Sequence, residues 1–145
     1  MVTKDIERIS NSHWEGTLRE GKGELNSNSG VLKNLPYNVG SRFASEPGTN
    51  PEELLGAAHA ACFTMALTSG LSAKDYHIEY VNTEAHVFMN ATDARGITHI
   101  RLVVHAKVHG VNANEFKTLA DDAGHNCLIS RALASVPVEV ESILD

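Results

Sequence analysis

Two segments in the second half of the chain alternate apolar and polar residues over more than ten positions each. The first, "HIEYVNTEAHVFMN" (77–90), and the second, "ITHIRLVVHAKVHG" (97–110), are separated by the turn-forming run "ATDARG". Such alternation predicts a half-buried antiparallel hairpin. A turn at Asp93 to Gly96 would place Ala85 opposite Val104. The positions expected to face inward are Val81, Thr83, Ala85, Val87, Met89, Ile100, Leu102, Val104, Ala106 and Val108.

The stretch "NPEELLGAAHAACF" (50–63) predicts the start of a long helix. Asn50 suits the N-cap, Pro51 the first helical position, and Glu53 a capping box. The body from Leu54 to Leu67 carries no charge, which is typical of a helix buried on all sides. Because one domain of this size cannot easily hide such a helix, we expect a partner subunit to cover part of it.

The C-terminal third predicts two more helices and a strand. "NANEFKTLADDAGHNC" has helical spacing, with Asn112 or Asn114 as its cap, and Gly124 is expected to end or bend it. "CLISRALAS" predicts a short helix with Cys127 at or near its start, and "VPVEVESI" predicts a closing strand.

The N-terminal part is polar and rich in turn-forming residues. "HWEGTLREGKGEL" (13–25) predicts a hairpin with Trp14 and Leu18 as inward anchors, and the segment 31–43 is expected to be extended or irregular, because Pro36 limits sheet pairing. The order of elements is typical of an α+β fold, and we expect one domain over residues 1–145.

Composition and charge narrow the choice of partners. The chain has 145 residues and a net charge of −6 with interspersed signs, which argues against nucleic acid or an anionic membrane as a partner. No signal peptide is visible, and no stretch approaches the ~18 apolar residues of a membrane span. We therefore expect a cytoplasmic location, where thiols are kept reduced.

The two cysteines, Cys62 and Cys127, are candidates for chemistry as well as for core packing. An apolar site raises the pKa of a thiol, so a reactive Cys62 needs a nearby cation. Arg42 is the natural donor, and Lys33 is a less rigid alternative. His59, three residues before Cys62, could instead form the Cys–His pair of a hydrolase, although no third orienting residue is evident.

These motifs resemble a known family. "NPEELLGAAHAACF", preceded by "SRFASEPGT" and followed far downstream by "NCLIS", resembles the osmotically inducible protein C and organic hydroperoxide resistance (OsmC/Ohr) family over nearly the whole chain. "HWEGTLREGKGELNSNSGVLKNLPY" is similar to the OsmC branch in particular. The resemblance implies antiparallel sheets packed around two long helices, in an intertwined homodimer.

The resemblance also implies a cysteine-based peroxidase that reduces organic hydroperoxides to alcohols with a dithiol reductant, such as a lipoyl protein, and no cofactor. By motif position, Cys62 matches the peroxidatic cysteine, Cys127 the resolving cysteine, Arg42 the arginine beside the thiolate, and Glu52 the carboxylate that orients it. Leu128 stands where many members have proline, and we expect it to alter the mobility of Cys127.

Spacing leaves the assembly of this site open. Glu52 and Cys62 are about 15 Å apart along a regular helix, so either Arg42 spans the gap or two chains combine to form the site. Alternatives to the peroxidase are a hydroperoxide-sensing or lipid-binding module with little turnover, and the Cys–His hydrolase. A metal site on the outward histidines of one strand is disfavoured by their separation. Those histidines are His99, His105 and His109.

Overall fold

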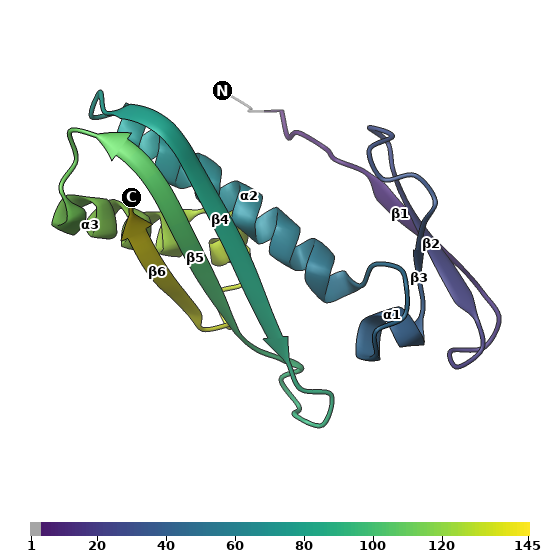
Figure 1. Cartoon of the computed structure of the whole chain (residues 1–145). Coiled ribbons are helices and arrows are strands. Elements are labelled where there is room, and N and C mark those ends of the chain that lie inside the picture. The colour runs from purple at the N-terminus through teal and green to yellow at the C-terminus, as the bar shows by residue number, and fades with distance from the viewer. Residues whose placement is uncertain (1–3) are drawn as a thin grey trace. The chain divides into compact units, whose positions relative to one another are not determined.

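The computed structural model describes residues 4–145, and the chain divides into two compact units at Leu54 and Leu55 (Figure 1). One helix, α2 (Pro51–Ser72), begins in the first unit and continues into the second. The expectation of a single domain over residues 1–145 stays a prediction.

The first unit holds a small antiparallel sheet in the order β1-β2-β3. Its strands are β1 (Ser10–Glu15), β2 (Lys22–Ser27) and β3 (Leu35–Tyr37). The predicted hairpin is confirmed, with Trp14 paired to Gly23. The rings of Trp14 and Tyr37 lie 5.5 Å apart over Gly23, where a Cβ would lie within 2.3 Å of Tyr37. Leu18 is 76% exposed, so its prediction as an inward anchor is wrong; it lies in the turn between the two strands.

A short helix, α1 (Val39–Phe43), replaces the irregular segment that the sequence predicted. Its start is a capping box, in which the Asn38 side chain accepts from Ser41 N and the Ser41 hydroxyl accepts from Asn38 N. Pro36 lies in β3, at the edge of the sheet, where a missing N–H is tolerated.

Helix α2 starts where its capping residues predicted. Asn50 Oδ1 accepts a hydrogen bond from Glu53 N at 2.8 Å. The Glu53 carboxylate accepts from Thr49 Oγ1 at 3.0 Å, in place of the reciprocal bond that completes a capping box. The cap is therefore one-sided.

The second unit contains a three-stranded sheet in the order β4-β5-β6. The long hairpin of β4 (His77–Met89) and β5 (Ile97–His109) is confirmed, but its register differs by two residues, because Ala85 pairs with Leu102. The turn causes this difference. Asn90 N donates a hydrogen bond to the Gly96 carbonyl, and the strand pairing therefore begins with Met89 opposite Ile97. A slip of two keeps each side chain on its predicted face.

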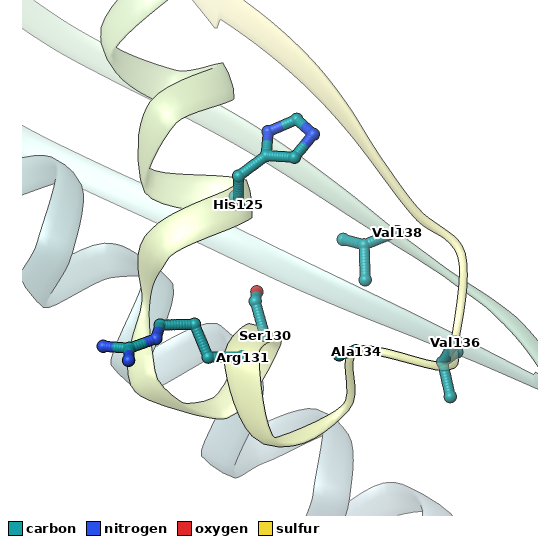
Figure 2. A pocket seen from close by; sticks show the side chains of 7 residues that line it. His125, Ser130, Arg131, Ala134, Val136 and Val138 are labelled. Carbon is teal, nitrogen blue, oxygen red and sulfur yellow. The ribbon is translucent and has the colours of Figure 1, made fainter.

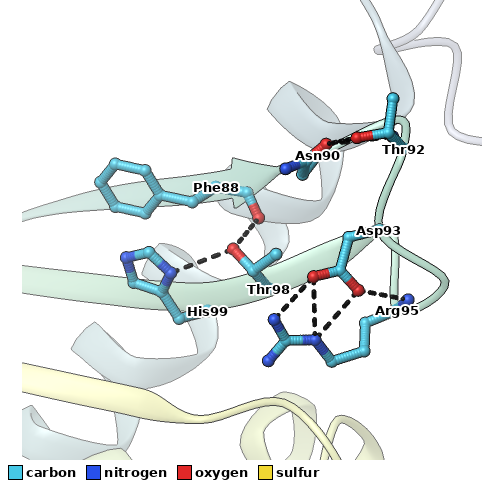
Figure 3. A network of polar contacts seen from close by, with 7 residues as sticks. All are labelled: Phe88, Asn90, Thr92, Asp93, Arg95, Thr98 and His99. Atoms are coloured by element: carbon cyan, nitrogen blue, oxygen red, sulfur yellow. Dashed lines mark hydrogen bonds and ion pairs between the residues drawn. The ribbon is translucent and has the colours of Figure 1, made fainter.

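The turn is held by its own polar side chains (Figure 3). Asn90 Oδ1 accepts from the backbone N–H and hydroxyl of Thr92, and Arg95 forms a forked ion pair with Asp93 at 2.7 Å. These local bonds explain why the register of the hairpin differs by two residues from the one that the hydrophobic pattern alone indicated.

The core lies between this sheet and the helices on one of its faces (Figure 1). Helix α3 (Ala113–Asn126) is capped by Asn112, as predicted, and the short helix α4 (Leu128–Ala132) follows directly. Gly124 does not end α3, which runs on to Asn126; a Cβ there would lie 2.4 Å from Val140 Cγ2, so the glycine lets the helix approach the sheet. The fully buried large side chains are Phe63, Phe116, Leu67, Leu71, Ile100, Leu102, His59 and Val104.

The α+β class is confirmed, with one difference in the second sheet. Strand β6 (Val138–Leu144) runs parallel to β5, whereas the family resemblance implied antiparallel sheets. Helices α3 and α4 connect β5 to β6. Such a helical crossover lets the second strand run in the same direction as the first.

Helix α2 is long and apolar enough to cross a membrane by length and composition. The expectation that no stretch reaches this criterion is therefore wrong. The core helix of a soluble protein passes the same test, and α2 carries Phe63, Leu67 and Leu71 into the core. One such helix is weak support for a membrane span.

Candidate active site

Cys127 belongs to the hydrophobic core of the second unit, and Cys62 borders that core. Cys62 is half-buried on α2 and packs against the core cluster that contains Cys127. Cys127 is 3% exposed and is the N-cap of α4, as its place before that helix predicted. Both thiols are free. Two residues that are far apart in the sequence are therefore associated with the same core.

The sulfur of Cys127 is hydrogen-bonded to Ser130 in two ways. The Ser130 backbone N–H donates to Cys127 Sγ at 3.4 Å, and the thiol donates to Ser130 Oγ at 3.1 Å. Backbone N–H groups at the start of a helix are available to partners outside the helix, and they favour negative charge. Sequence reasoning missed Ser130; the available signal was a serine three residues after a cysteine that starts a helix.

His59 is fully buried and reaches the same serine. Its Nε2 lies 2.7 Å from Ser130 Oγ, and among residues 4–145 its Nδ1 has no hydrogen-bond partner. Burial lowers the pKa of His59, because desolvation disfavours the imidazolium. Within the described chain no hydrogen bond joins His59 to Cys62, so the geometry of a Cys62–His59 hydrolase pair is not observed.

Arg42 and Glu52 form a forked ion pair in the first unit. Arg42 Nη2 lies 2.6 Å from Glu52 Oε1, and Arg42 Nε donates to both carboxylate oxygens at 3.2 Å. The hydrogen bonds that Arg42 donates to the Glu52 carboxylate raise the pKa of Arg42 above its ordinary value. The guanidinium also lies over the ring of Phe43, with 5.2 Å from Cζ to the centroid. Arg42 is therefore charged and fixed in direction.

A pocket of about 430 Å³ opens beside α4 (Figure 2). Ser130 lines it together with residues from the end of α3 and the approach to β6. The remaining lining residues are Gly124, His125, Arg131, Ala134, Val136 and Val138. The serine that contacts the Cys127 sulfur thus also borders a solvent-accessible space. Leu128, where many relatives in the resembled family have proline, is the first residue of α4 and is 71% exposed.

The outward histidines of β5 have partners of other kinds. His99 stacks on Phe88 with 4.2 Å between ring centroids, His105 lies 3.5 Å from Asp145, and His109 pairs with Glu79. Over residues 4–145, no group of three or more His, Cys, Asp or Glu side chains is arranged to hold a metal ion.

Comparison with known proteins identifies the family. A family model described as "OsmC-like protein" matches residues 44–141, which is more than half of the chain. The chain belongs to the OsmC family. It is 41% identical to "Peroxiredoxin OsmC" of Escherichia coli (strain K12) over 129 residues, covering 88% of this chain and 90% of that protein.

Solved structures agree on the fold. An "organic hydroperoxide resistance protein OsmC" from Legionella pneumophila is 25% identical and has a TM-score of 0.68, with 99% of each chain covered. An OsmC-like protein from Mycoplasma pneumoniae has a TM-score of 0.74 at 16% identity, covering 97% of this chain and 99% of that one. At that identity the second likeness shows the fold alone.

Family membership supports a peroxiredoxin-like redox role for this chain. It implies peroxidase activity in general, with a peroxide as substrate and a thiol as reductant. The roles of Cys62, Cys127, Arg42 and Glu52 in that chemistry stay predictions.

Proposed function

We propose that this chain reduces organic hydroperoxides to alcohols, with Cys62 as the peroxidatic thiol. The Cys62 thiolate attacks one peroxide oxygen, an S–O bond forms, and the O–O bond breaks. The sulfur is oxidised to a sulfenic acid, and the alkoxide that leaves takes up a proton to become the alcohol. A half-buried sulfur on an apolar helix suits an alkyl or lipid hydroperoxide better than hydrogen peroxide.

The observation that carries the proposal is that one free cysteine, Cys127, lies in the core against which the other, Cys62, packs. The Cys127 thiolate attacks the Cys62 sulfenic acid, the S–S bond forms, and the oxygen leaves as hydroxide, which becomes water. A dithiol such as a lipoyl group then reduces the disulfide and is itself oxidised. We place this cycle in the cytoplasm, where such reductants are kept reduced.

Arg42 supplies the positive charge that this chemistry requires. A thiolate among hydrocarbon groups is disfavoured unless a cation stabilises it, and a guanidinium can also donate hydrogen bonds to the peroxide oxygens. The forked bonds from Arg42 to Glu52 support this role, because they fix the guanidinium before substrate arrives.

We further propose that the chain acts as a homodimer. Helix α2 leaves an apolar stripe exposed, in which Ala57, Ala61 and Met65 follow one another at intervals of four residues. Met65 is 74% exposed. A second copy that covers this stripe would complete the burial that the uncharged body of the helix predicts.

The test is peroxide consumption with cumene hydroperoxide and with hydrogen peroxide, each with a lipoyl reductant and with a monothiol. The wild-type protein should prefer cumene hydroperoxide and the dithiol. Cys62→Ser should abolish turnover, while Cys127→Ser should allow one oxidation and block recycling. Mass spectrometry should find a bond between Cys62 and Cys127 in the oxidised protein. Turnover that persists in Cys62→Ser would end the proposal, and single oxidation without turnover in the wild type would favour a sensing module.

A further inference from the structure

The thiol of Cys127 is the start of a buried chain of hydrogen bonds that ends on an imidazole. The thiol donates to Ser130 Oγ at 3.1 Å, and that oxygen lies 2.7 Å from His59 Nε2. The three side chains come from α4, its N-cap and α2, and each is at most 7% exposed. Cys127 is only 3% exposed, and although Ser130 also borders the pocket beside α4, its hydroxyl is the acceptor that the thiol proton contacts.

We infer that Ser130 and His59 form a proton relay that converts Cys127 to a thiolate as it attacks the oxidised Cys62. This inference rests on the proposed function and assigns a role to two residues that the peroxidase proposal does not use. Ser130 touches the reacting sulfur, whereas His59 acts through Ser130.

The donor directions on the chain fit this transfer. Because the thiol donates to Ser130 Oγ, the serine hydroxyl is free to donate to His59 Nε2, which leaves the ring proton on Nδ1. Burial lowers the pKa of His59, so the ring is neutral and can accept a proton at neutral pH. Among the described residues no carboxylate bonds Nδ1, so nothing holds the ring as a permanent imidazolium.

The step balances without any added reagent. The Cys127 proton passes to Ser130 Oγ as the serine proton passes to His59 Nε2. The Cys127 sulfur then forms the S–S bond, the S–O bond of Cys62 breaks, and hydroxide leaves. The Cys127 sulfur is oxidised and the Cys62 sulfur is reduced to the disulfide level. His59 lies one helical turn from Cys62 on α2, so the leaving hydroxide can take the proton from the imidazolium and become water.

The other ionisable groups on the surrounding elements are poor candidates for this acceptor. Arg101 is on the face of β5 opposite the core residues Ile100 and Leu102. Asp121 of α3 is paired with Lys117 at 2.6 Å. His125 lines the same pocket as Ser130, but its Nδ1 lies 2.7 Å from the Asp121 carbonyl oxygen. The other exposed charged side chains of α3, α4 and β6 include Asp122, Arg131, Glu139 and Glu141.

The experiment separates the two oxidation steps in single-turnover reactions with one equivalent of cumene hydroperoxide. Sulfenic acid on Cys62 is trapped with dimedone, and the disulfide is followed by mass spectrometry. The variants are Ser130→Ala, which removes the hydroxyl, and His59→Gln, which can still bond Ser130 but cannot accept a proton. Both should form sulfenic acid at the wild-type rate and form the disulfide about 100-fold more slowly, the lower end of general base catalysis.

The pH profile distinguishes a relay from a packing role. In the variants, disulfide formation should rise about tenfold per pH unit below the pKa of an ordinary thiol, since only the thiolate attacks. The wild-type rate should change much less over the same range. Ser130→Thr keeps the hydroxyl and should restore the wild-type profile. Thr64→Val is the matched control, because it removes a 2.7 Å hydrogen bond from α2 to Thr83 without touching the relay.

The outcomes are distinct for the two proposals. If the wild-type protein forms no sulfenic acid on Cys62, the proposed function fails. If sulfenic acid forms normally and both Ser130→Ala and His59→Gln make the disulfide at the wild-type rate and pH profile, the relay alone is overturned.

Discussion

The Arg42 guanidinium and the Glu52 carboxylate, ten residues apart in the sequence, are joined by a 2.6 Å bond from Nη2 and by two 3.2 Å bonds from Nε. The carboxylate is mostly buried, with 11% of its side chain exposed, whereas Arg42 keeps 42% of its side chain exposed. The mostly buried Glu52 carboxylate therefore fixes the direction of the Arg42 guanidinium. The ion pair contributes little to the stability of the fold, because Arg42 is partly exposed to solvent.

Replacing Glu52 by glutamine should therefore reduce activity far more than stability. We expect kcat/KM for cumene hydroperoxide to fall about 10- to 100-fold, because a misdirected catalytic group has effects of that order. The free energy of unfolding should change by less than about 1 kcal/mol, as for other partly exposed ion pairs.

The matched control is Glu53→Gln on the adjacent residue, whose carboxylate accepts from Thr49 and does not contact Arg42. It should keep nearly full activity. Equal losses in the two variants would mean that the negative charge of this helical turn matters and the orientation of Arg42 does not.

Gly124 is required by the packing of α3 on the second sheet. An added Cβ would lie 2.4 Å from Val140 Cγ2, a distance that real Cβ atoms do not adopt. Gly124→Ala should destabilise the protein by about 1–3 kcal/mol, as overpacked cores do, measured by urea unfolding. Adding Val140→Ala should recover part of that loss, because it removes the methyl group that clashes.

Gly70 provides the comparison within another helix. A Cβ there would lie at an ordinary contact distance of 3.6 Å from Leu119 Cδ2. Gly70→Ala should be neutral or stabilising by up to about 1 kcal/mol, because alanine is the better helix former. If both alanine variants behave alike, the close approach at Gly124 is not what selects glycine there.

Local signals in the sequence predicted the fold where neighbouring residues decide it. Asn50 and Asn112 mark helix starts through bonds to residues three positions on, so both caps could be predicted. The five-residue helix α1 was missed because its start depends on Asn38 and Ser41, in a segment with no hydrophobic period. The hairpin register was wrong by two because side chains and backbone of the turn, and not the strand pattern, decide where the ladder closes.

The candidate site divides in the same way. Arg42 and Glu52 were named from motif position, and the structure brings them into contact. Ser130 was missed: its place three residues after Cys127 was a local signal, but its pairing with His59, 71 residues away, leaves no local pattern. The parallel pairing of β6 was missed for the same reason, since it depends on the path of the chain through α3 and α4.

The ion pair of Asp93 with Arg95 makes the stabilisation of the turn between β4 and β5 depend on pH. Hydrogen bonds from the Arg95 side chain and backbone lower its pKa from 3.8 to about 2. A carboxyl whose pKa is lower in the folded state binds its proton more readily when unfolded. Its stabilisation is therefore complete above about pH 4 and is lost as pH falls toward 2.

The measurement is urea unfolding of the wild type and Asp93→Asn at several values between pH 6 and pH 2. The wild type should be the more stable at pH 6, and the difference should shrink as the carboxyl becomes protonated. Asp122→Asn, at an exposed position with no ion pair among the described residues, should show no such trend. A difference that stays constant down to pH 2 would contradict the assignment.

Met65 tests the proposed dimer and, with it, a site built from two chains. It is 74% exposed in the uncharged body of α2, where it extends the apolar stripe of Ala57 and Ala61 that a partner would cover. Met65→Glu should convert the dimer to monomers, because burying an unpaired carboxylate at an interface is costly. Light scattering would measure this change in mass. Leu18→Glu, at a residue that is 76% exposed in a turn, introduces the same charge and should leave the dimer intact.

If each site needs both chains, the Met65→Glu monomer should lose peroxidase activity. A monomer that remains fully active would leave the dimer without a catalytic role, and a wild-type protein that is itself monomeric would remove the proposed partner altogether.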